Sequence, residues 1–139
     1  MRAAVALLLL LISTAASAQV AVVNIGVRDA VDRDHLRNIL LGRVTTWTDG
    51  TQVVLVLAND EATRVAVFDL TGRDLDRLLR GWKRILFSGN GAMPLSTTGA
   101  NEALALVAQR PGAIAIVGVT PPADPRIRVA MTLGAPAEP

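Results

Sequence analysis

The residues best suited to chemistry lie in a short loop, Asn59–Arg64, that follows an apolar run at Val53–Leu57. The apolar run is typical of a buried strand, and a helix is expected to begin at Glu61. A loop of this kind points the free backbone N–H groups of the helix at the end of the strand. Together with the Thr63 hydroxyl and the Arg64 guanidinium, those groups are suited to hold a small oxyanion.

Two acidic residues in the same loop support a different interpretation. Asp60 and Glu61 are residues that ordinarily stabilise the positive end of a helix dipole. A carboxylate there already takes the role of the anion, and two of them would repel phosphate by roughly a few kcal/mol if desolvated. Physical chemistry alone favours the capping role, and both interpretations stay open. The candidate ligand-binding residues are Asp60, Glu61, Thr63 and Arg64.

The rest of the chain holds few residues suited to catalysis. It has no cysteine and one histidine, His35, and beyond the first eighteen residues its serines are Ser88 and Ser96. Neither serine lies in a G-x-S-x-G pattern, and neither is near the histidine in sequence. Nucleophilic catalysis needs a nucleophile beside a base. We therefore expect no catalytic residues and a protein that is not an enzyme.

No pattern predicts a metal ion or a cofactor. A lone histidine cannot form a metal site. Asp29, Asp32 and Asp34 suggest calcium, but the later Gly and Glu of a calcium loop are missing, so turn and capping roles are expected. The glycine-rich stretch Phe87–Pro94 has neither a third glycine at phosphate-loop spacing nor a following Lys-Ser/Thr pair, so it is not a nucleotide-binding motif.

Charge and composition give no indication of a nucleic-acid partner. The 139-residue chain has 14 Lys and Arg against 12 Asp and Glu, a net charge of +2, with 3% aromatic residues. Neither a cluster of like charge nor an interleaving of basic with aromatic residues supports nucleic-acid binding. Basic residues between Arg73 and Arg84 share one side of a predicted helix, and a solvated helix surface is their expected role.

The first eighteen residues are typical of a signal peptide. Arg2 precedes the apolar run Ala3–Ile12, and Ala16-Ser17-Ala18 matches an A-x-A signal, so we expect cleavage after Ala18. The run is shorter than the roughly 20 residues of a membrane span, which disfavours an uncleaved anchor and stable membrane insertion after cleavage. Without cysteine, neither disulfides nor a lipid on an N-terminal cysteine are expected. The expected location is the bacterial periplasm or the exterior.

Residues 19–134 are expected to form one α/β domain, followed by a disordered tail at 135–139. Four apolar runs predict strands: Val20–Val27, Val53–Leu57, Ala113–Val119 and Ile127–Leu133. Between them, apolar residues at helical spacing predict four helices, with starts at Asp32, Glu61, Asp74 or Asp76, and Thr97 or Thr98. Strands alternating with helices favour a three-layer domain with a mostly parallel sheet.

Several local features are predicted within these elements. Gly42 is expected to end the first helix in a left-handed conformation, and Trp47 is expected to fold back onto the core. The second helix also permits a strand, because Val65, Val67 and Asp69 alternate. If it is helical, its apolar face is expected to contain four residues: Ala62, Val65, Ala66 and Leu70.

Four segments also carry a family pattern by their order and spacing. They are Leu36–Gly50 (LRNILLGRVTTWTDG), Glu61–Arg64 (EATR), Trp82–Pro94 (WKRILFSGNGAMP) and Leu104–Gly118 (LALVAQRPGAIAIVG). This order resembles the phosphate-binding proteins of ABC importers, in the periplasmic-binding-protein class. The resemblance runs from about Val20 to Leu133. It implies the fold of one receptor lobe and a small oxyanion such as phosphate as ligand.

Two departures from the family pattern affect this expectation. The family's ligand helix usually begins Gly-Ser-x-Thr, often with Arg next, whereas this chain begins Asp60-Glu61-Ala62 before Thr63 and Arg64. The resemblance therefore transfers Thr63 and Arg64 as anion contacts, but neither the glycine that permits close backbone approach nor the serine hydroxyl. The family's second lobe has no counterpart here, and a single lobe leaves an anion exposed to water, where such contacts are weak.

Two functions are consistent with these observations. The first is a periplasmic solute-binding-like protein that binds phosphate or another small oxyanion. The alternative is a degenerate binding lobe that acts as a scaffold or protein-interaction module without a small-molecule ligand. Its partner would be another protein or a second copy of the chain in a homodimer.

Overall fold

The structure is a computed structural model that describes residues 19–89 and 92–133. The predicted signal peptide at 1–18 and the predicted tail at 135–139 lie outside the described residues. Nine elements follow one another in this part of the chain: β1 Val20–Asn24, α1 Arg33–Leu40, β2 Val54–Ala58, α2 Glu61–Thr71, α3 Leu75–Phe87, β3 Leu95–Thr97, α4 Ala100–Gln109, β4 Ala113–Val117 and β5 Ile127–Thr132.

The strands form one mixed sheet in the order β3-β2-β4-β1-β5. β2 pairs in parallel with both β3 and β4, whereas β1 is antiparallel to both β4 and β5. Four of the described strands therefore run in one direction and β1 runs in the other, so the sheet is mostly parallel, as predicted. The carboxyl ends of β2, β3 and β4 meet at one end of the sheet, and α2 begins there.

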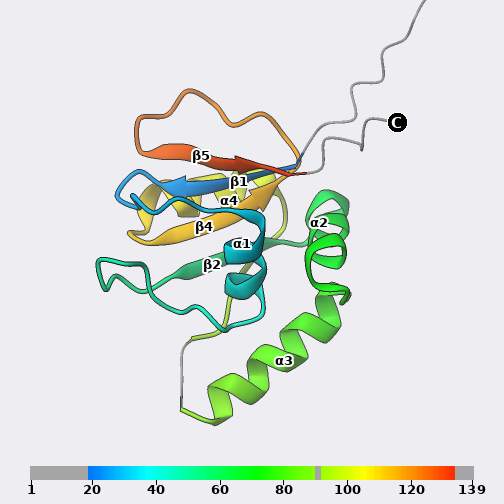
Figure 1. The fold of residues 1–139 in the computed structure, drawn as a ribbon. Coiled ribbons are helices and arrows are strands. Elements are labelled where there is room, and N and C mark those ends of the chain that lie inside the picture. The colour runs from blue at the N-terminus through cyan, green and yellow to red at the C-terminus, as the bar shows by residue number, and fades with distance from the viewer. Residues whose placement is uncertain (1–18, 90–91, 134–139) are drawn as a thin grey trace, which may run out of the picture.

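Helices cover both faces of the sheet, which gives the three layers seen in Figure 1. α1, α2 and α3 pack in one apolar cluster with strand residues such as Val23 and Ile116. α4 packs on the opposite face against the alternate residues, such as Val22 and Ala115. Because neighbouring side chains on a strand point to opposite faces, a strand covered on both faces must be apolar throughout. This explains the uninterrupted apolar runs of the sequence.

The first helix and the turn after it follow the sequence predictions. Asp32 caps α1, with its carboxylate accepting a hydrogen bond from the His35 N–H at 2.7 Å. Gly42, just beyond the helix, has a φ of +73°. Trp47 is buried in the core, also as predicted.

Trp47 also joins two distant segments of the chain. Its indole Nε1 donates a hydrogen bond to the Gly112 carbonyl at 2.9 Å, which fixes the turn against the start of β4. Gly112 has a φ of +78°, and a Cβ there would lie 2.2 Å from the Gln52 carbonyl oxygen. The backbone conformation and the space both require glycine at this position.

The structure corrects the predicted apolar face of α2. The segment is helical, so the strand interpretation is excluded. Thr63 and Val67 are buried on the inner face together with Ala66, whereas Val65, predicted to be there, is 47% exposed. Ala66 and Leu70 are buried as predicted. The prediction was wrong for Val65 because it used apolar residues alone to orient the helix, and the polar Thr63 is fully buried.

The region between α3 and α4 also differs from the prediction. A short strand, β3, was not anticipated, because three residues are too few to show a period. Neither Thr97 nor Thr98 caps α4; its N-cap is Gly99, with no side-chain cap bond. Thr97 belongs to β3, and Thr98 donates from its N–H and hydroxyl to the Glu102 carboxylate. Two predicted strands also end early, at Asn24 and Val117.

Candidate functional site

The candidate site is the loop through which the chain passes from β2 into α2. The Asn59 N–H donates to the Thr97 carbonyl at 2.8 Å, which continues the pairing of β2 and β3 to the end of the sheet. Asp60 is the N-cap, and its carboxylate accepts from the Thr63 N–H at 2.9 Å. The bond satisfies one of the N–H groups left free at a helix start. A carboxylate of the chain therefore occupies part of the place an anion would take.

Thr63 faces the core rather than the solvent. It is fully buried, and its hydroxyl donates to the Ile116 carbonyl of β4 at 3.3 Å. The preceding residue, Ala62, also packs tightly on this strand, since a Cβ on Gly118 would lie 2.3 Å from the Ala62 Cβ. The Thr63 hydroxyl therefore helps to hold the first turn of α2 against β4.

Arg64 and Glu61 lie on the solvent side of the same turn. The Arg64 guanidinium donates to the Asn59 side-chain oxygen, so this side chain folds back over the loop. The four residues predicted from the sequence are thus close together, but they do not converge on one point. Arg64, Glu61 and the first amide groups of the helix are the polar groups available to a molecule approaching from solvent.

An apolar surface beside these residues was not identified from the sequence. Val65 is 47% exposed, Phe68 is 61% exposed and Val119 is 44% exposed. Val65 and Phe68 are neighbours on the outer side of α2 because they are three residues apart in a helix. Val119 lies apart from this pair, in a hollow with the first residues of α4. We call the outer side of the first turns of α2 the α2 surface and define it by four residues: Glu61, Arg64, Val65 and Phe68.

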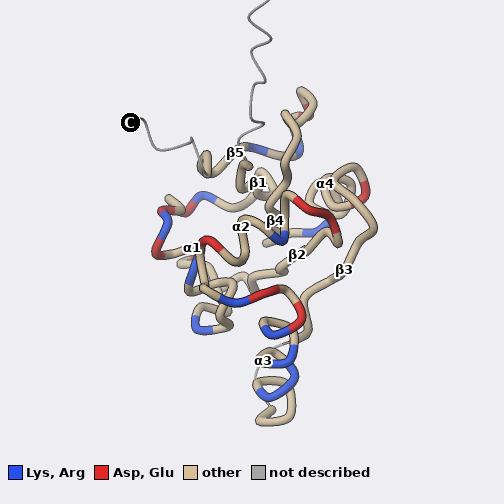
Figure 2. The backbone as a smooth tube through the Cα atoms, turned by 90° about the vertical axis from the view of Figure 1, so that its right-hand side faces the viewer, with Lys and Arg blue, Asp and Glu red and all other residues tan. Residues whose placement is uncertain are grey.

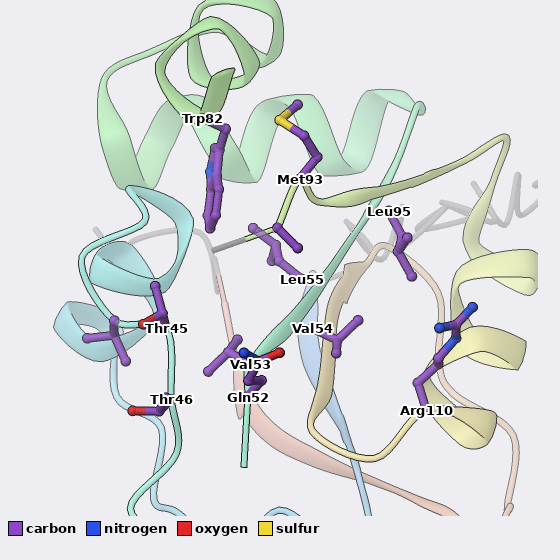
Figure 3. A pocket seen from close by; sticks show the side chains of 12 residues that line it. Thr45, Thr46, Gln52, Val53, Val54, Leu55, Trp82, Met93, Leu95 and Arg110 are labelled. Atoms are coloured by element: carbon purple, nitrogen blue, oxygen red, sulfur yellow. The ribbon is translucent and has the colours of Figure 1, made fainter. Parts of the chain in front are cut away.

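A pocket of about 240 Å³ lies near the opposite end of β2. Figure 3 shows Trp82, Met93 and Leu55 around one part of it, and Gln52 and Arg110 around another. Twelve residues from separate segments line it: Val44, Thr45, Thr46, Gln52, Val53, Val54, Leu55, Trp82, Ala92, Met93, Leu95 and Arg110. β2 is about 13 Å long at the usual strand rise, so this pocket is separate from the start of α2.

Other residues singled out in the sequence have structural roles. The Asp29 carboxylate accepts from the N–H and the hydroxyl of Thr48, at 3.0 and 2.7 Å, and Asp32 caps α1. The ring of His35 stands edge-on to Trp47, with the ring centroids 5.9 Å apart. Within residues 19–89 and 92–133, no group of three His, Cys, Asp or Glu side chains is placed to hold a metal ion.

Local hydrogen bonds shift the pKa values of several surface carboxyl groups. Hydrogen bonds lower the pKa of three surface carboxyl groups: Asp49, through the Thr51 N–H; Glu102, through the Thr98 N–H; and Asp124, through the Arg126 guanidinium. These are interactions within a turn or a first helical turn, and they form no shared site. Across the described part of the chain, no helix is long and apolar enough to span a membrane.

The sheet order, the three layers and the position of α2 define an α/β domain that matches one lobe of a periplasmic binding protein. No protein-family model matches the chain, and no curated protein matches it. Among solved structures, it is similar to the crystal structure of an ABC-type phosphate transport receptor from Vibrio cholerae, with a TM-score of 0.54 and 17% identity. The match covers 81% of this chain and 44% of the receptor, so the chain spans less than half of that protein.

Proposed function

We propose that this chain is a binding-protein lobe that acts as a protein-interaction module, with the α2 surface as its contact region. The observation that carries the proposal is the hydrogen bond from the Thr63 N–H to the Asp60 carboxylate. The helix start is already capped by a negative group. The Thr63 hydroxyl is also engaged, with the Ile116 carbonyl. The loop therefore offers a small anion fewer donors than the family pattern would.

The α2 surface has features that suit a protein partner. Val65 and Phe68 place exposed apolar area next to the charged groups of Glu61 and Arg64. Protein interfaces commonly combine an aromatic or aliphatic centre with a polar rim. The signal-peptide prediction supports a partner in the periplasm or the exterior, and that partner is a different protein or a second copy of this chain.

Photo-crosslinking tests this proposal in the full-length chain expressed in its host. A photoreactive residue at Phe68 is expected to give a discrete adduct, and the same residue at Arg37, an exposed position on α1, is expected to give none. Substitution Val65→Asp should remove the adduct, because it places a charge in the apolar contact. Identical patterns from both probes, or no adduct from Phe68, would refute the proposal. Light scattering of the purified chain distinguishes self-pairing from binding to another protein.

A second function is favoured by the exposed Arg64 in a fold similar to that of a phosphate transport receptor. In this alternative the chain is a solute-binding protein that contacts phosphate or another small oxyanion through Arg64, Thr63 and the first amides of α2. For the anion to reach those amides, the Asp60 carboxylate must leave the Thr63 N–H. Loss of such a cap costs about 0.5–2 kcal/mol, which the anion contacts must exceed.

Calorimetry with phosphate, sulfate and small carboxylates separates the two functions. Under the interaction proposal, the wild type does not bind these anions at concentrations of about 1 mM, whereas Asp60→Gly combined with Glu61→Ser gains phosphate binding. The variant is expected to fold, because glycine at an N-cap costs only a few tenths of a kcal/mol relative to the best caps. Phosphate binding by the wild type that is lost in Arg64→Gln would instead establish the solute-binding function.

A further inference from the structure

Four arginine residues line a polar recess where α2 meets α3. They are Arg73, Arg77, Arg80 and Arg84, and the remaining lining comes from Thr71, Gly72 and Gly81, with no carboxylate among these residues. Arg77, Arg80 and Arg84 lie in line along one side of α3, because they are spaced by three and four residues. Figure 2 shows basic residues gathered along α3. The recess is distinct from the α2 surface and has a volume of about 550 Å³.

The turn between the two helices positions Arg73 beside the other three. Gly72 ends α2 with a φ of +70°, which turns the chain toward α3. The Thr71 hydroxyl accepts from the Arg73 N–H at 3.2 Å and fixes this turn. The Arg73 side chain then extends along α3, since a Cβ on Gly81 would lie 3.6 Å from Arg73 Nη1. That distance is an ordinary van der Waals contact, so the guanidinium group lies directly against this part of α3.

The described residues that line the recess supply no counterion for its positive charges. Within the described residues, none of the four guanidinium groups forms a salt bridge or a side-chain hydrogen bond. Three carboxylates lie nearby in the chain. Asp69 pairs with Arg33 at 2.8 Å, and Asp74 accepts from the backbone N–H of Arg77 at 2.8 Å. Asp76 lies in the first turn of α3, four residues before Arg80, and forms no ion pair with a described residue. Neighbouring like charges on a helix repel each other, so a bound anion would relieve an unfavourable interaction.

We infer that this recess binds an anion that carries two or more phosphate groups. The guanidinium group presents paired N–H donors that match phosphate oxygens, and it stays charged at all physiological pH values. Arg77 and Arg84 are seven residues apart on α3, about 10 Å at helical rise, which is farther than the oxygens of a single phosphate group extend. Closely spaced phosphate groups occur in soluble polyphosphates and on lipid surfaces with phosphate headgroups. Arginine side chains would recognise both through the same contacts with phosphate oxygens.

Calorimetry with inorganic tripolyphosphate and inorganic phosphate tests the inference on the chain lacking residues 1–18 and on the full-length chain. Tripolyphosphate is expected to bind more tightly than phosphate, and its affinity should be higher at about 0.01 M than at about 0.15 M ionic strength. The double substitution Arg77→Gln and Arg80→Gln should weaken tripolyphosphate binding at least about tenfold, because two charge-assisted contacts are lost.

A matched control removes the same charge from elsewhere. Arg28→Gln with Arg37→Gln changes two exposed arginines outside the recess and should weaken binding less than about threefold, the effect of net charge alone. Equal losses in the two double variants would overturn the inference. Circular dichroism of each variant shows whether the fold is retained, and the recess arginines are not in the core, so unfolding is not expected.

Vesicle flotation separates the two sources of phosphate. Vesicles of phosphatidic acid in phosphatidylcholine present phosphate monoesters on a surface, and phosphatidylcholine vesicles alone are the blank. Arginine-dependent flotation with phosphatidic acid assigns the recess to a lipid surface, and arginine-dependent tripolyphosphate binding without flotation assigns it to a soluble polyphosphate. If neither probe binds, or if Arg77 and Arg80 have no effect on either, the inference is wrong.

Discussion

The start of α2 and the outer side of α3 use their polar residues in opposite ways. At α2, Asp60 caps the helix and the Thr63 hydroxyl bonds to the Ile116 carbonyl. On α3, the arginine side chains of the recess make no ion pair with any described residue. The residues that resemble a ligand site are therefore largely engaged by the fold, whereas the arginine stripe, expected to be solvated, makes no ion pair within the described part of the chain. Availability, as well as residue type, decides whether a polar group can bind a ligand.

The largest expected effect concerns how α3 is attached. Trp82 is buried, and its indole Nε1 donates to the Leu40 carbonyl at 2.8 Å. Trp82→Ala should lower the free energy of unfolding by about 3–5 kcal/mol, through a cavity and a lost hydrogen bond. Leu86→Ala, at a position that is 43% exposed, is the control and should cost less than about 1 kcal/mol. Denaturant unfolding measures both, and equal losses would show that α3 is not anchored through Trp82.

The next effect concerns the buried hydroxyl of α2. Thr63→Val keeps the shape but removes the donor to the Ile116 carbonyl, and should cost about 1–3 kcal/mol in unfolding free energy. Thr120→Val, at an exposed position, is the matched control and should change stability by less than about 0.5 kcal/mol. If both variants were equally stable, the Thr63 hydroxyl would not be engaged by the fold and would be available to a ligand. The polar groups of α2 and α3 would then not differ in availability.

A smaller effect is expected at the cap of α2. Asp60→Ala removes the acceptor for the Thr63 N–H and should destabilise the chain by about 0.5–2 kcal/mol. Asp60→Gly should cost only a few tenths of a kcal/mol, because glycine is tolerated at this position. Thermal unfolding of the two variants side by side tests the order, and a reversed order would mean that the carboxylate does not act as a cap.

The smallest effect is a pH dependence at α4. Hydrogen bonds from Thr98 hold the pKa of Glu102 below its ordinary value of 4.5. The folded state therefore favours the carboxylate form of Glu102. The stability that these hydrogen bonds contribute is present above pH 4.5 and is lost as the pH falls through the lower pKa of the folded state. Wild type should be slightly more stable than Glu102→Gln at neutral pH, and the difference should vanish in acid. A difference that grows on acidification would contradict the direction of the shift.

The elements that follow a local period were predictable from the sequence. The apolar runs predicted β1, β2 and β4 because both faces of the sheet are covered. The buried residues of α3 are Leu75, Leu78 and Trp82, and their spacing of three and four follows the helical period. The connection Asn59–Asp60 between β2 and α2 was also placed correctly, with the helix beginning at Glu61 as predicted. β3 was missed, since it is three residues long and depends on its parallel pairing with β2.

The candidate site was predictable in position but not in orientation. The residues alone indicated that Asp60 caps α2, and the structure shows that bond. That Thr63 points inward depends on how α2 is rotated against β4, which Ala62 and Gly118 control by close contact. The exposed pair Val65 and Phe68 results from the same rotation. The sequence of the helix alone does not predict this rotation, because the contacts that determine it come from a strand some fifty residues later.

The sequence by itself determined the fold class, the order of most elements and several caps, because these depend on side-chain periods and on residues adjacent in the chain. Tertiary structure alone decided which polar groups are already engaged. Asp60 and Thr63 are bonded within the α2–β4 region, whereas Arg73 is brought back over Gly81 to join the arginines of α3. Such pairings depend on distances between elements, and a linear sequence does not specify those distances residue by residue.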